Sequence, residues 1–449
     1  MNIFLVSPHY PPRFIGGTEK MAHRLAHSFA ARGHTVEVAA VDSVGMQDET
    51  LLCQTEMEGE VTVHRLRLDE RSLLRPLGLN FCNTAIQNWF REHIRSNRPD
   101  VVHLLSGYLT TGCVLEAAFE EKIPSLVTLV DFWMMCPLIT LLRSDGQLCS
   151  TPVEPARCVW CIRSMQRRYR LLDQTLGGLP GELFTFLGKA GLLRASRAYR
   201  EEEEAIRQRR EHNRQLLQNV DVVITQSRFF EEKLKEYDML PRRMIFAPYG
   251  LEKTNHREGS ARQKKSEKFR IGYLGQIAVH KGVHVLVEAY RLLDLPPGRA
   301  ELRLYGDLEA WPEYVRSLRA MARGREDVLF LGPFPGHEID RIMDECDVIV
   351  TPSVWYENHP TVILEAFDHG KPVIASDLGG MIEMVRHGVD GFLFEAGNPR
   401  SLAEQLRKLI DDPSLYARLC AGIQPVRRLD EEVSDLELLY AELIKSRRG

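Results

Sequence analysis

The segment that most constrains the fold of this chain runs from Asp347 to Ala375. An apolar run, Asp347–Val350, precedes a polar loop, and a helical stretch then leads to a second apolar run, Pro372–Ala375. This order of strand, loop, helix and strand is the repeating unit of a parallel α/β sheet. The loop and the helix N-terminus lie at the carboxyl edge of such a sheet, where unpaired backbone N–H groups and the helix dipole attract anions. The segment therefore predicts a phosphate-binding edge.

Two carboxylates within this segment narrow the kind of ligand. Glu357 lies in the loop and Glu365 lies about one turn into the helix, eight positions later. A carboxylate is a poor phosphate ligand, but it suits a ligand that also has hydroxyl groups, as a nucleotide-sugar does. The alternative is that both are solvated surface charges, one in the loop and one on the helix.

The order of residues across 352–376 is P-S-x-x-Y-E-x-x-P-x-x-x-L-E-A-x-x-x-G-x-P-V-I-A-S. It resembles the retaining glycosyltransferases of family 4, and the resemblance extends over nearly the whole chain. It implies the α/β GT-B fold: two doubly wound, Rossmann-like domains facing a cleft. The implied reaction moves a sugar from a nucleoside-diphosphate sugar to an acceptor with retention at the anomeric carbon and without a catalytic metal ion.

The resemblance also implies roles for individual residues. Glu357 would bind the donor sugar and support positive charge at its anomeric carbon, and Glu365 would hold the ribose. Lys281, in Gly275–Gly282, would neutralise the departing diphosphate together with nearby backbone amides. Further donor contacts are implied for Gly16, Gly17, Gln276, Phe334, Asn358, His359, Pro360, Thr361 and Leu364.

Three positions depart from the family pattern. Gln276 replaces the usual arginine of G-R-x4-K-G, Leu105 replaces the second histidine of His-x-His, and Val130 stands where a histidine often precedes the aspartate. His103 is left as a catalytic candidate, although it could equally be a structural strand-end residue. Two alternatives stay open: a nucleotide-sugar epimerase on the same fold and, because of the three departures, a catalytically impaired protein that binds a nucleotide-sugar.

Four cysteines form the clearest group outside the donor site. Cys136, Cys149, Cys158 and Cys161 have the spacing C-x12-C-x8-C-x2-C. Four thiolates, two of them on a tight knuckle, suit a closed tetrahedral zinc site that holds a loop. An iron–sulfur cluster, a zinc ribbon for nucleic acid and four buried, metal-free thiols are the alternatives. A subset of family 4 glycosyltransferases has a similar cysteine-bearing insertion.

The pattern of composition divides the chain. We expect an acceptor-side domain over 1–250 with a cysteine-rich and helical insertion at about 134–219. A polar linker over 251–268, a donor domain over 269–425 and a C-terminal helix over 426–449 follow, and this helix could cross back to the first domain.

Composition limits the partners. The 449 residues suit two domains, and a formal net charge of −4 argues against a nucleic-acid binder.

Neither an export signal nor an apolar run of spanning length is evident, so we expect a cytoplasmic protein. The basic, partly apolar stretch 163–193 could rest on a membrane carrying a lipid-linked acceptor, or could be a solvated helical face. The acceptor, a glycan, lipid-linked saccharide or small molecule, and the oligomeric state stay open.

Overall fold

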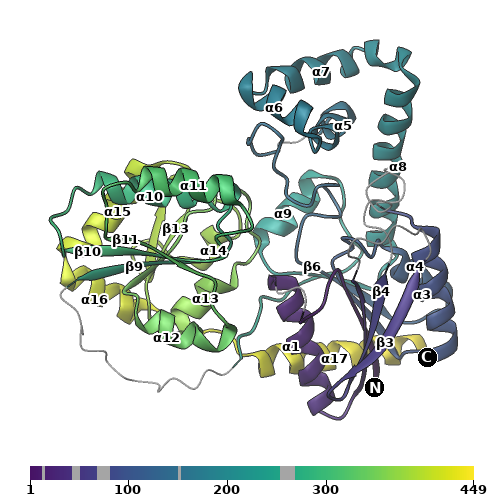
Figure 1. Cartoon of the computed structure of the whole chain (residues 1–449). Helices are drawn as coiled ribbons and strands as arrows, with labels where there is room; N and C mark the ends of the chain where they lie inside the picture. The colour runs from purple at the N-terminus through teal and green to yellow at the C-terminus, as the bar shows by residue number, and fades with distance from the viewer. Residues whose placement is uncertain (13–15, 43–50, 68–80, 150–152, 253–267, 449) are drawn as a thin grey trace. The chain divides into compact units, whose positions relative to one another are not determined.

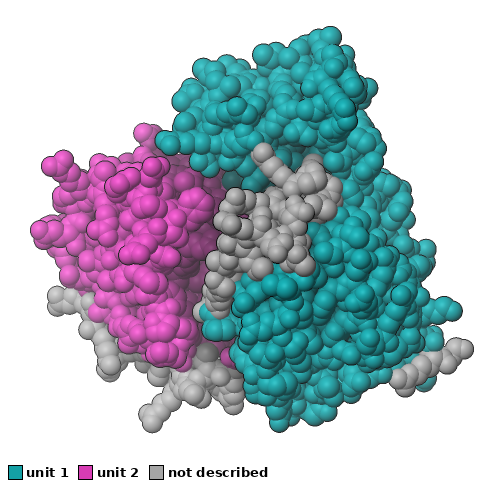
Figure 2. All heavy atoms as spheres, turned by 45° about the vertical axis from the view of Figure 1, so that its right-hand side comes forward, with its two compact units in different colours: residues 1–248, 430–449 teal, residues 249–429 magenta. Residues whose placement is uncertain are grey.

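A computed structural model describes residues 1–12, 16–42, 51–67, 81–149, 153–252 and 268–448. The chain forms two compact units (Figures 1 and 2). Unit 1 comprises Met1–Pro248 with Asp430–Gly449, and unit 2 comprises Tyr249–Leu429. The linker predicted over 251–268 falls mostly on 253–267, outside the described residues.

Unit 1 is built on an eight-stranded sheet with the order β3-β4-β2-β1-β5-β6-β7-β8. Only β3 runs antiparallel to its neighbour; the other pairings are parallel. The central strands β1, β5 and β6 are mainly apolar and buried over nearly their whole length, because helices cover both faces of a parallel sheet. The strands are β1 (Asn2–Ser7), β2 (Thr35–Val41), β3 (Leu52–Glu58), β4 (Val61–Arg67), β5 (Val101–Leu105), β6 (Ser125–Leu129), β7 (Val222–Thr225) and β8 (Met244–Phe246).

The helices of unit 1 fall into two groups. Those that accompany the sheet are α1 (Gly17–Ala31), α3 (Thr84–Asn97), α4 (Cys113–Glu120), α9 (Arg228–Glu236) and α17 (Leu429–Arg448). A second group lies between β6 and β7, where the sequence predicts a helical insertion (Figure 1). It consists of α5 (Pro155–Arg163), α6 (Arg167–Thr175), α7 (Leu179–Lys189), the short helix η2 (Leu192–Ala195) and α8 (Arg197–Asn219).

The C-terminal helix α17 returns to unit 1. Its Tyr440 is fully buried, and its Glu437 forms ion pairs with Arg32 and His34 at the end of α1. Residues from opposite ends of the sequence therefore share one core.

Unit 2 has a six-stranded parallel sheet with the order β11-β10-β9-β12-β13-β14. Its strands are β9 (Phe269–Leu274), β10 (Ala300–Tyr305), β11 (Val328–Gly332), β12 (Val348–Thr351), β13 (Val373–Ser376) and β14 (Gly391–Phe394). Its helices are η3 (Val279–Lys281), α10 (Val283–Leu292), α11 (Pro312–Met321), η4 (Gly336–Glu338), α12 (Ile339–Asp344), α13 (Thr361–Asp368), α14 (Met381–Met384), α15 (Pro399–Asp411) and α16 (Pro413–Gly422).

The strand order of unit 2 reverses between β9 and β12. In open α/β sheets the loops that leave two such strands diverge to opposite faces and leave a crevice at the carboxyl edge, which is where ligands bind. Both units are doubly wound and Rossmann-like, so the predicted fold class is confirmed. Within the described residues, none of the helices has the length and apolar character needed to span a bilayer.

Candidate donor site

The site of unit 2 centres on the Glu357 carboxylate. Its Oε1 atom accepts hydrogen bonds from Lys281 Nζ at 2.7 Å, Ser353 Oγ at 2.7 Å and Trp355 Nε1 at 2.8 Å. Lys281 follows β9 and Glu357 follows β12, so the pair joins the two loops at the point where the strand order reverses. Two residues that the sequence singled out separately, 76 positions apart, therefore form one ion pair.

The environment keeps Glu357 ionised. Burial alone would raise its pKa, but the charge of Lys281 and the three hydrogen bonds outweigh burial and lower the pKa. The Lys281 ammonium also lies 4.9 Å from the centre of the Trp355 ring, a cation–π contact. Both side chains of the ion pair are largely shielded, with 23% of Lys281 and 12% of Glu357 exposed.

Two glycines let the neighbouring loops approach this carboxylate. Gly282 has φ of 69°, and a Cβ atom there would lie 1.8 Å from the carbonyl oxygen of Pro352. Gly379, in the loop after β13, has φ of 63°, and its Cβ would lie 2.6 Å from the carbonyl oxygen of Glu357. That carbonyl accepts a hydrogen bond from the Gly380 amide at 2.8 Å. Loops from three neighbouring strands therefore converge at Glu357, and only glycine fits at two of the contacts.

Helix α13 begins beside this cluster. Its N-cap is Pro360, so no side chain caps its first backbone N–H groups, which are left for another acceptor. His359 is half-buried, and burial of its ring lowers its pKa to about 4, so the ring is neutral near pH 7. Its Nδ1 atom is buried and has no hydrogen-bond partner among the described residues.

The remaining predicted donor contacts of unit 2 lie at the same edge of the sheet. Glu365 and Leu364 are half-buried on α13, and Asn358 is buried just before it. Gln276 is exposed in the loop after β9, where its carbonyl oxygen accepts a hydrogen bond from Tyr273 Oη at 2.6 Å. Thr361 is the first residue of α13. Phe334 follows β11 and packs edge-on against Tyr305, with ring centres 5.9 Å apart.

Sequence reasoning did not identify two partners of the central carboxylate. Ser353 and Trp355 are fixed by their hydrogen bonds to Glu357, at 2.7 and 2.8 Å. In the sequence, the one indication is that Ser353 and Trp355 lie four and two residues before Glu357. Only the path of the loop shows that both side chains turn toward the same carboxylate oxygen. The sequence likewise does not show that His280 contacts this group; its ring centre lies 4.4 Å from that of Trp355.

The predicted site residues of unit 1 have different surroundings. Gly16 is the N-cap of α1 and Gly17 is its first residue, so both lie at a helix N-terminus as expected. His103, in contrast, is fully buried inside β5: its Nδ1 lies 2.6 Å from Tyr440 Oη and its Nε2 lies 2.7 Å from Thr128 Oγ1. Burial lowers its pKa to about 3. Because both ring nitrogens are used within the core, this environment favours the structural alternative for His103, and its catalytic role stays a prediction.

The four cysteines of the insertion are half-buried free thiols. Cys158 and Cys161 lie three residues apart on helix α5, rather than on the tight knuckle that the sequence suggested. All four belong to one electrostatic group: burial, together with the charge of the neighbouring thiolates, raises the pKa of Cys149 and Cys158 and raises that of Cys161 to about 11. Their side chains therefore share one region of the fold, as a common ligand would require.

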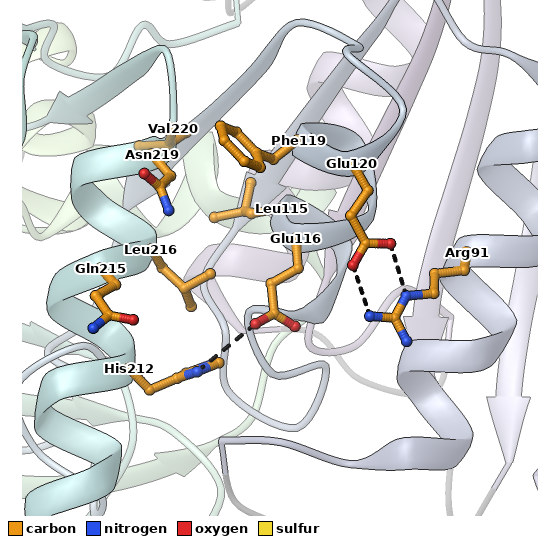
Figure 3. A pocket seen from close by; sticks show the side chains of 10 residues that line it. All are labelled: Arg91, Leu115, Glu116, Phe119, Glu120, His212, Gln215, Leu216, Asn219 and Val220. Carbon is orange, nitrogen blue, oxygen red and sulfur yellow. Dashed lines mark hydrogen bonds and ion pairs between the residues drawn. The ribbon is translucent and has the colours of Figure 1, made fainter.

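A separate cavity of about 310 Å³ lies in unit 1, among α3, α4 and α8 (Figure 3). Arg91 and Glu120 form an ion pair on one side, and His212 lies 3.7 Å from Glu116 on the other. Leu115 and Leu216 form part of the wall between them. None of the predicted donor-site residues lines this cavity.

Comparison with known proteins agrees with the geometry. The family model for glycosyl transferases group 1 matches residues 255–422, and the model for the glycosyl transferase 4-like domain matches residues 16–172. The chain belongs to the family 4-like glycosyltransferases of the GT-B fold. The resemblance seen in the sequence is thereby confirmed; the four-cysteine subset stays a prediction.

Curated relatives match the chain over part of their own length. D-inositol 3-phosphate glycosyltransferase of Stackebrandtia nassauensis is 36% identical over 34% of the chain and 36% of its own length. The capsular polysaccharide biosynthesis glycosyltransferase CapM of Staphylococcus aureus is 29% identical over 41% and 49% of the respective lengths. The chain thus spans roughly a third to a half of these relatives.

Solved structures match over nearly the full length of the chain. Sucrose-phosphate synthase from Thermosynechococcus elongatus gives a TM-score of 0.65 at 16% identity and covers 99% of both chains. Anabaena Alr3699/HepE in complex with UDP and glucose gives a TM-score of 0.61 at 18% identity, over 98% of this chain and 99% of the other. At these identities the likeness establishes the fold alone.

Proposed function

We propose that the chain transfers a sugar from a nucleoside-diphosphate sugar to a hydroxyl acceptor, with retention at the anomeric carbon. The observation behind this proposal is the Lys281–Glu357 pair at the reversal point of the unit 2 sheet, with N–O distance 2.7 Å, beside the uncapped N-terminus of α13. A cation and free backbone N–H groups suit a diphosphate, and an ionised carboxylate suits sugar hydroxyls and a developing positive charge.

The donor class rests on the same geometry. We expect Glu365 to bind the ribose hydroxyls and Phe334 to frame the base. HepE, whose fold this chain shares, has been solved in complexes with UDP and with UDP-glucose. A uridine diphosphate sugar is therefore the first donor to test.

The chemical step follows from the state of Glu357. As the bond between the anomeric carbon and the diphosphate oxygen breaks, the acceptor oxygen forms a new bond on the same face. The acceptor's proton passes to the departing phosphate oxygen, and Lys281 and backbone amides stabilise the negative charge there. Because Glu357 Oε1 already accepts three hydrogen bonds, it is a weak nucleophile but a well-placed counter-charge. This favours same-face attack over a glycosyl-enzyme intermediate; trapping such an intermediate would refute that route.

The acceptor class is proposed from the relatives. CapM is a glycosyltransferase of capsular polysaccharide biosynthesis, and AmsK of Erwinia amylovora, 33% identical over 31% of this chain, is one of amylovoran biosynthesis. We propose a saccharide acceptor of polysaccharide or cell-envelope assembly, free or lipid-linked.

A ligand-binding experiment tests the proposal. The melting temperature is measured with UDP, ADP, GDP and their sugars, because a ligand that binds only the folded state must raise it. We expect one nucleotide to raise the midpoint for the wild type and for the control Glu383→Gln, and to lose this effect in Glu365→Ala. If no nucleotide shifts the midpoint, the proposed donor site is refuted.

Turnover then separates the alternatives. Release of nucleoside diphosphate that depends on a saccharide acceptor supports transfer. Conversion of the nucleotide-sugar without an acceptor would indicate an epimerase, and binding without turnover would indicate a protein that has lost catalysis.

We further propose that Cys136, Cys149, Cys158 and Cys161 hold a structural zinc ion. Arg209, which is buried beside these cysteines, supports this proposal. Burial lowers the pKa of its guanidinium to about 10, and the negative charges of Cys136 and Cys158 act in the opposite direction by raising it. A tetrathiolate zinc site is dianionic, so a buried guanidinium suits it. The four sulfur atoms are not among the described groups whose ligand atoms lie within 4.8 Å of one another. Binding one zinc ion would therefore require the cysteine side chains to rotate toward a common point.

Metal analysis tests the zinc proposal. We expect Cys158→Ser to hold one zinc per chain fewer than the wild type, and the control Cys346→Ser to hold as many as the wild type. Brown colour with iron and acid-labile sulfide would instead indicate an iron–sulfur cluster.

Finally, we propose that helices α6 and α7 of the insertion rest on an anionic membrane surface. Leucine and phenylalanine side chains there are unusually exposed: 69% for Leu179, 59% for Leu183 and 66% for Phe186. Basic residues flank them, including Arg167, Arg168 and Lys189. Apolar side chains with a basic rim are typical of interfacial helices. We expect co-sedimentation with phosphatidylglycerol vesicles and its loss in Leu183→Glu/Phe186→Glu; equal sedimentation of this variant would refute the contact.

A further inference from the structure

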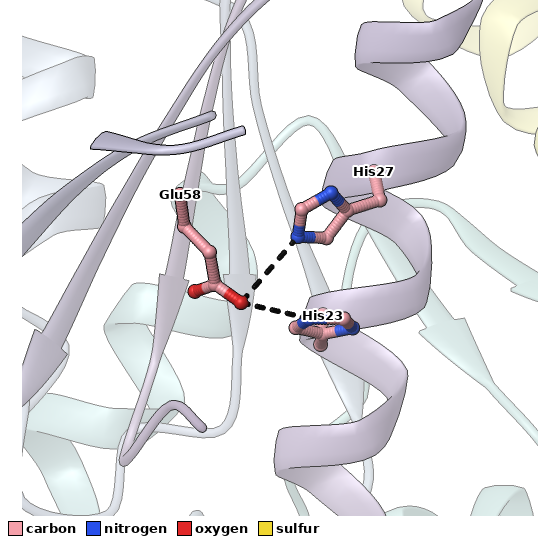
Figure 4. Close-up of side chains that lie close together, drawn as sticks. All are labelled: His23, His27 and Glu58. Atoms are coloured by element: carbon pink, nitrogen blue, oxygen red, sulfur yellow. Dashed lines mark hydrogen bonds and ion pairs between the residues drawn. The ribbon is translucent and has the colours of Figure 1, made fainter. Parts of the chain in front are cut away.

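A second group of ligand-type side chains lies in unit 1, apart from the cysteines. His23 and His27 project from the same face of α1, four residues apart, toward Glu58 at the end of β3 (Figure 4). Glu58 Oε1 lies 3.0 Å from His23 Nε2 and 3.7 Å from His27 Nε2. One nitrogen from each imidazole and one carboxylate oxygen lie within 4.8 Å of one another.

These separations suit a transition-metal ion. With ligand bonds of about 2.05 Å, a tetrahedral centre places its ligand atoms roughly 3.3 Å apart. The observed distances of 3.0 and 3.7 Å fall on either side of that value. Two histidines at i and i+4 on one helix face are also the arrangement that helical zinc sites use, because the spacing brings both rings to one point.

The protein's own hydrogen bonds leave this group incomplete. Among the described residues, His27 Nε2 and Glu58 Oε2 are buried atoms without a hydrogen-bond partner. The same is true of Tyr10 Oη, although Tyr10 is only 1% exposed. Tyr10 packs against His23, with ring centres 5.7 Å apart, and burial together with the Glu58 charge raises its pKa. Unsatisfied buried polar atoms are costly, so three at one place indicate a missing ligand.

A neighbouring cluster shows the contrast. Glu37 Oε2 lies 2.9 Å from His64 Nε2 and 3.0 Å from His93 Nε2, and Asn97 Nδ2 donates to it at 3.2 Å. The other nitrogen of His64 lies 3.0 Å from Thr55 Oγ1. In this cluster the hydrogen bonds account for the arrangement, and the polar atoms are satisfied without an ion.

We propose that His23, His27 and Glu58 form a binding site for zinc or a similar divalent transition metal. Nitrogen and carboxylate ligands favour such ions over calcium or magnesium, which prefer all-oxygen sites. The three side chains are about one-third exposed, so water supplies the remaining ligand. The ion links α1, whose first turn contains Gly16 and Gly17, to the β3–β4 hairpin.

The first test uses the wild-type chain, freed of metal and then titrated with zinc. Diethyl pyrocarbonate modifies accessible neutral imidazoles, and mass spectrometry of peptides reports each histidine separately. We expect zinc to slow modification of His23 and His27 at least tenfold and to leave that of the exposed His337 unchanged. Equal modification of His23 and His27 with and without saturating zinc would overturn the proposal.

Variants then measure affinity and separate this site from the cysteines. Cobalt bound to thiolates absorbs strongly in the near ultraviolet, whereas cobalt bound to nitrogen and oxygen shows only weak visible bands. We expect His27→Gln and Glu58→Gln each to weaken the nitrogen–oxygen site more than tenfold without changing the thiolate band. His93→Gln, from the satisfied cluster, is the matched control and should bind as the wild type does. If His27→Gln fails to fold, Glu58→Gln alone decides; wild-type affinity in that variant would refute the site.

Discussion

Replacing Lys281 with methionine tests the central ion pair most directly. The substitution keeps much of the side-chain volume but leaves Glu357 buried without its positive partner, whose Nζ lies 2.7 Å from Oε1. Removing one member of a buried pair costs about 3–5 kcal/mol. Because Ser353 and Trp355 continue to donate to the carboxylate, we expect the lower end of this range, about 3 kcal/mol.

The measurement is a double-mutant cycle on the free energy of opening of unit 2. Hydrogen exchange of peptides from β12 reports that energy without assuming that both units unfold together. Lys281→Met and Glu357→Gln are measured singly and combined. We expect the double variant to recover at least about 1 kcal/mol relative to the sum of the single effects, because the neutral amide no longer needs a cation. Strict additivity would show that the pair is not coupled and would refute the reasoning.

The pH dependence of unfolding provides an independent test of the same ion pair. The pKa of Glu357 is lower in the folded state than in the unfolded chain, so the folded state binds fewer protons. This contribution to stability is fully present above the unfolded pKa of about 4.3 and is lost as pH falls through the folded value. In Lys281→Met, the stability lost as the pH falls should be smaller than in the wild type, or the loss should begin at a higher pH.

Three further substitutions test single contacts. Gly282→Ala should lower the melting temperature by several degrees, since its Cβ would lie 1.8 Å from the Pro352 carbonyl oxygen and its φ is 69°; an unchanged midpoint would contradict the close approach. His103→Phe should reduce stability but leave nucleotide binding within about twofold, and a selective loss of turnover in a stably folded variant would support the catalytic role instead. Because burial lowers the pKa of His103 to about 3, wild-type stability should fall as pH decreases from about 6.5 toward 3, a dependence that His103→Phe should lessen in acid unfolding. Tyr440→Phe should cost about 1 kcal/mol in denaturant unfolding through its lost bond to His103, and no cost would show that this 2.6 Å contact is weak.

Much of the donor half could be predicted because its signals are local. The apolar runs before Pro352 and after Gly370 mark two neighbouring strands of unit 2, and the loop between them contains both Glu357 and the start of α13. Order along the chain is enough here, since parallel strands must present their carboxyl ends at one edge. The sequence could likewise place Lys281 at that edge, just after another strand.

Contacts between distant residues could not be predicted in this way. The order of residues along the chain does not show that Lys281 Nζ lies 2.7 Å from Glu357 Oε1. Nor does it show that the Tyr440 hydroxyl is hydrogen-bonded to a ring nitrogen of His103. For this reason the sequence leaves both alternatives open for His103: it places the residue in a strand, but the side chains that contact its ring come from β6 and α17.

The sequence by itself determined the two α/β domains, the family and the edge of the sheet where the donor is expected, because periodicity and short motifs are properties of neighbouring residues. The tertiary structure decided which polar groups are satisfied and which are not. His23, His27 and Glu58 illustrate this: the sequence places them 35 positions apart at most, and only the packing of α1 beside β3 brings their ligand atoms together. Hydrogen bonding and metal binding depend on distances in space, and those follow from the packing of the whole chain.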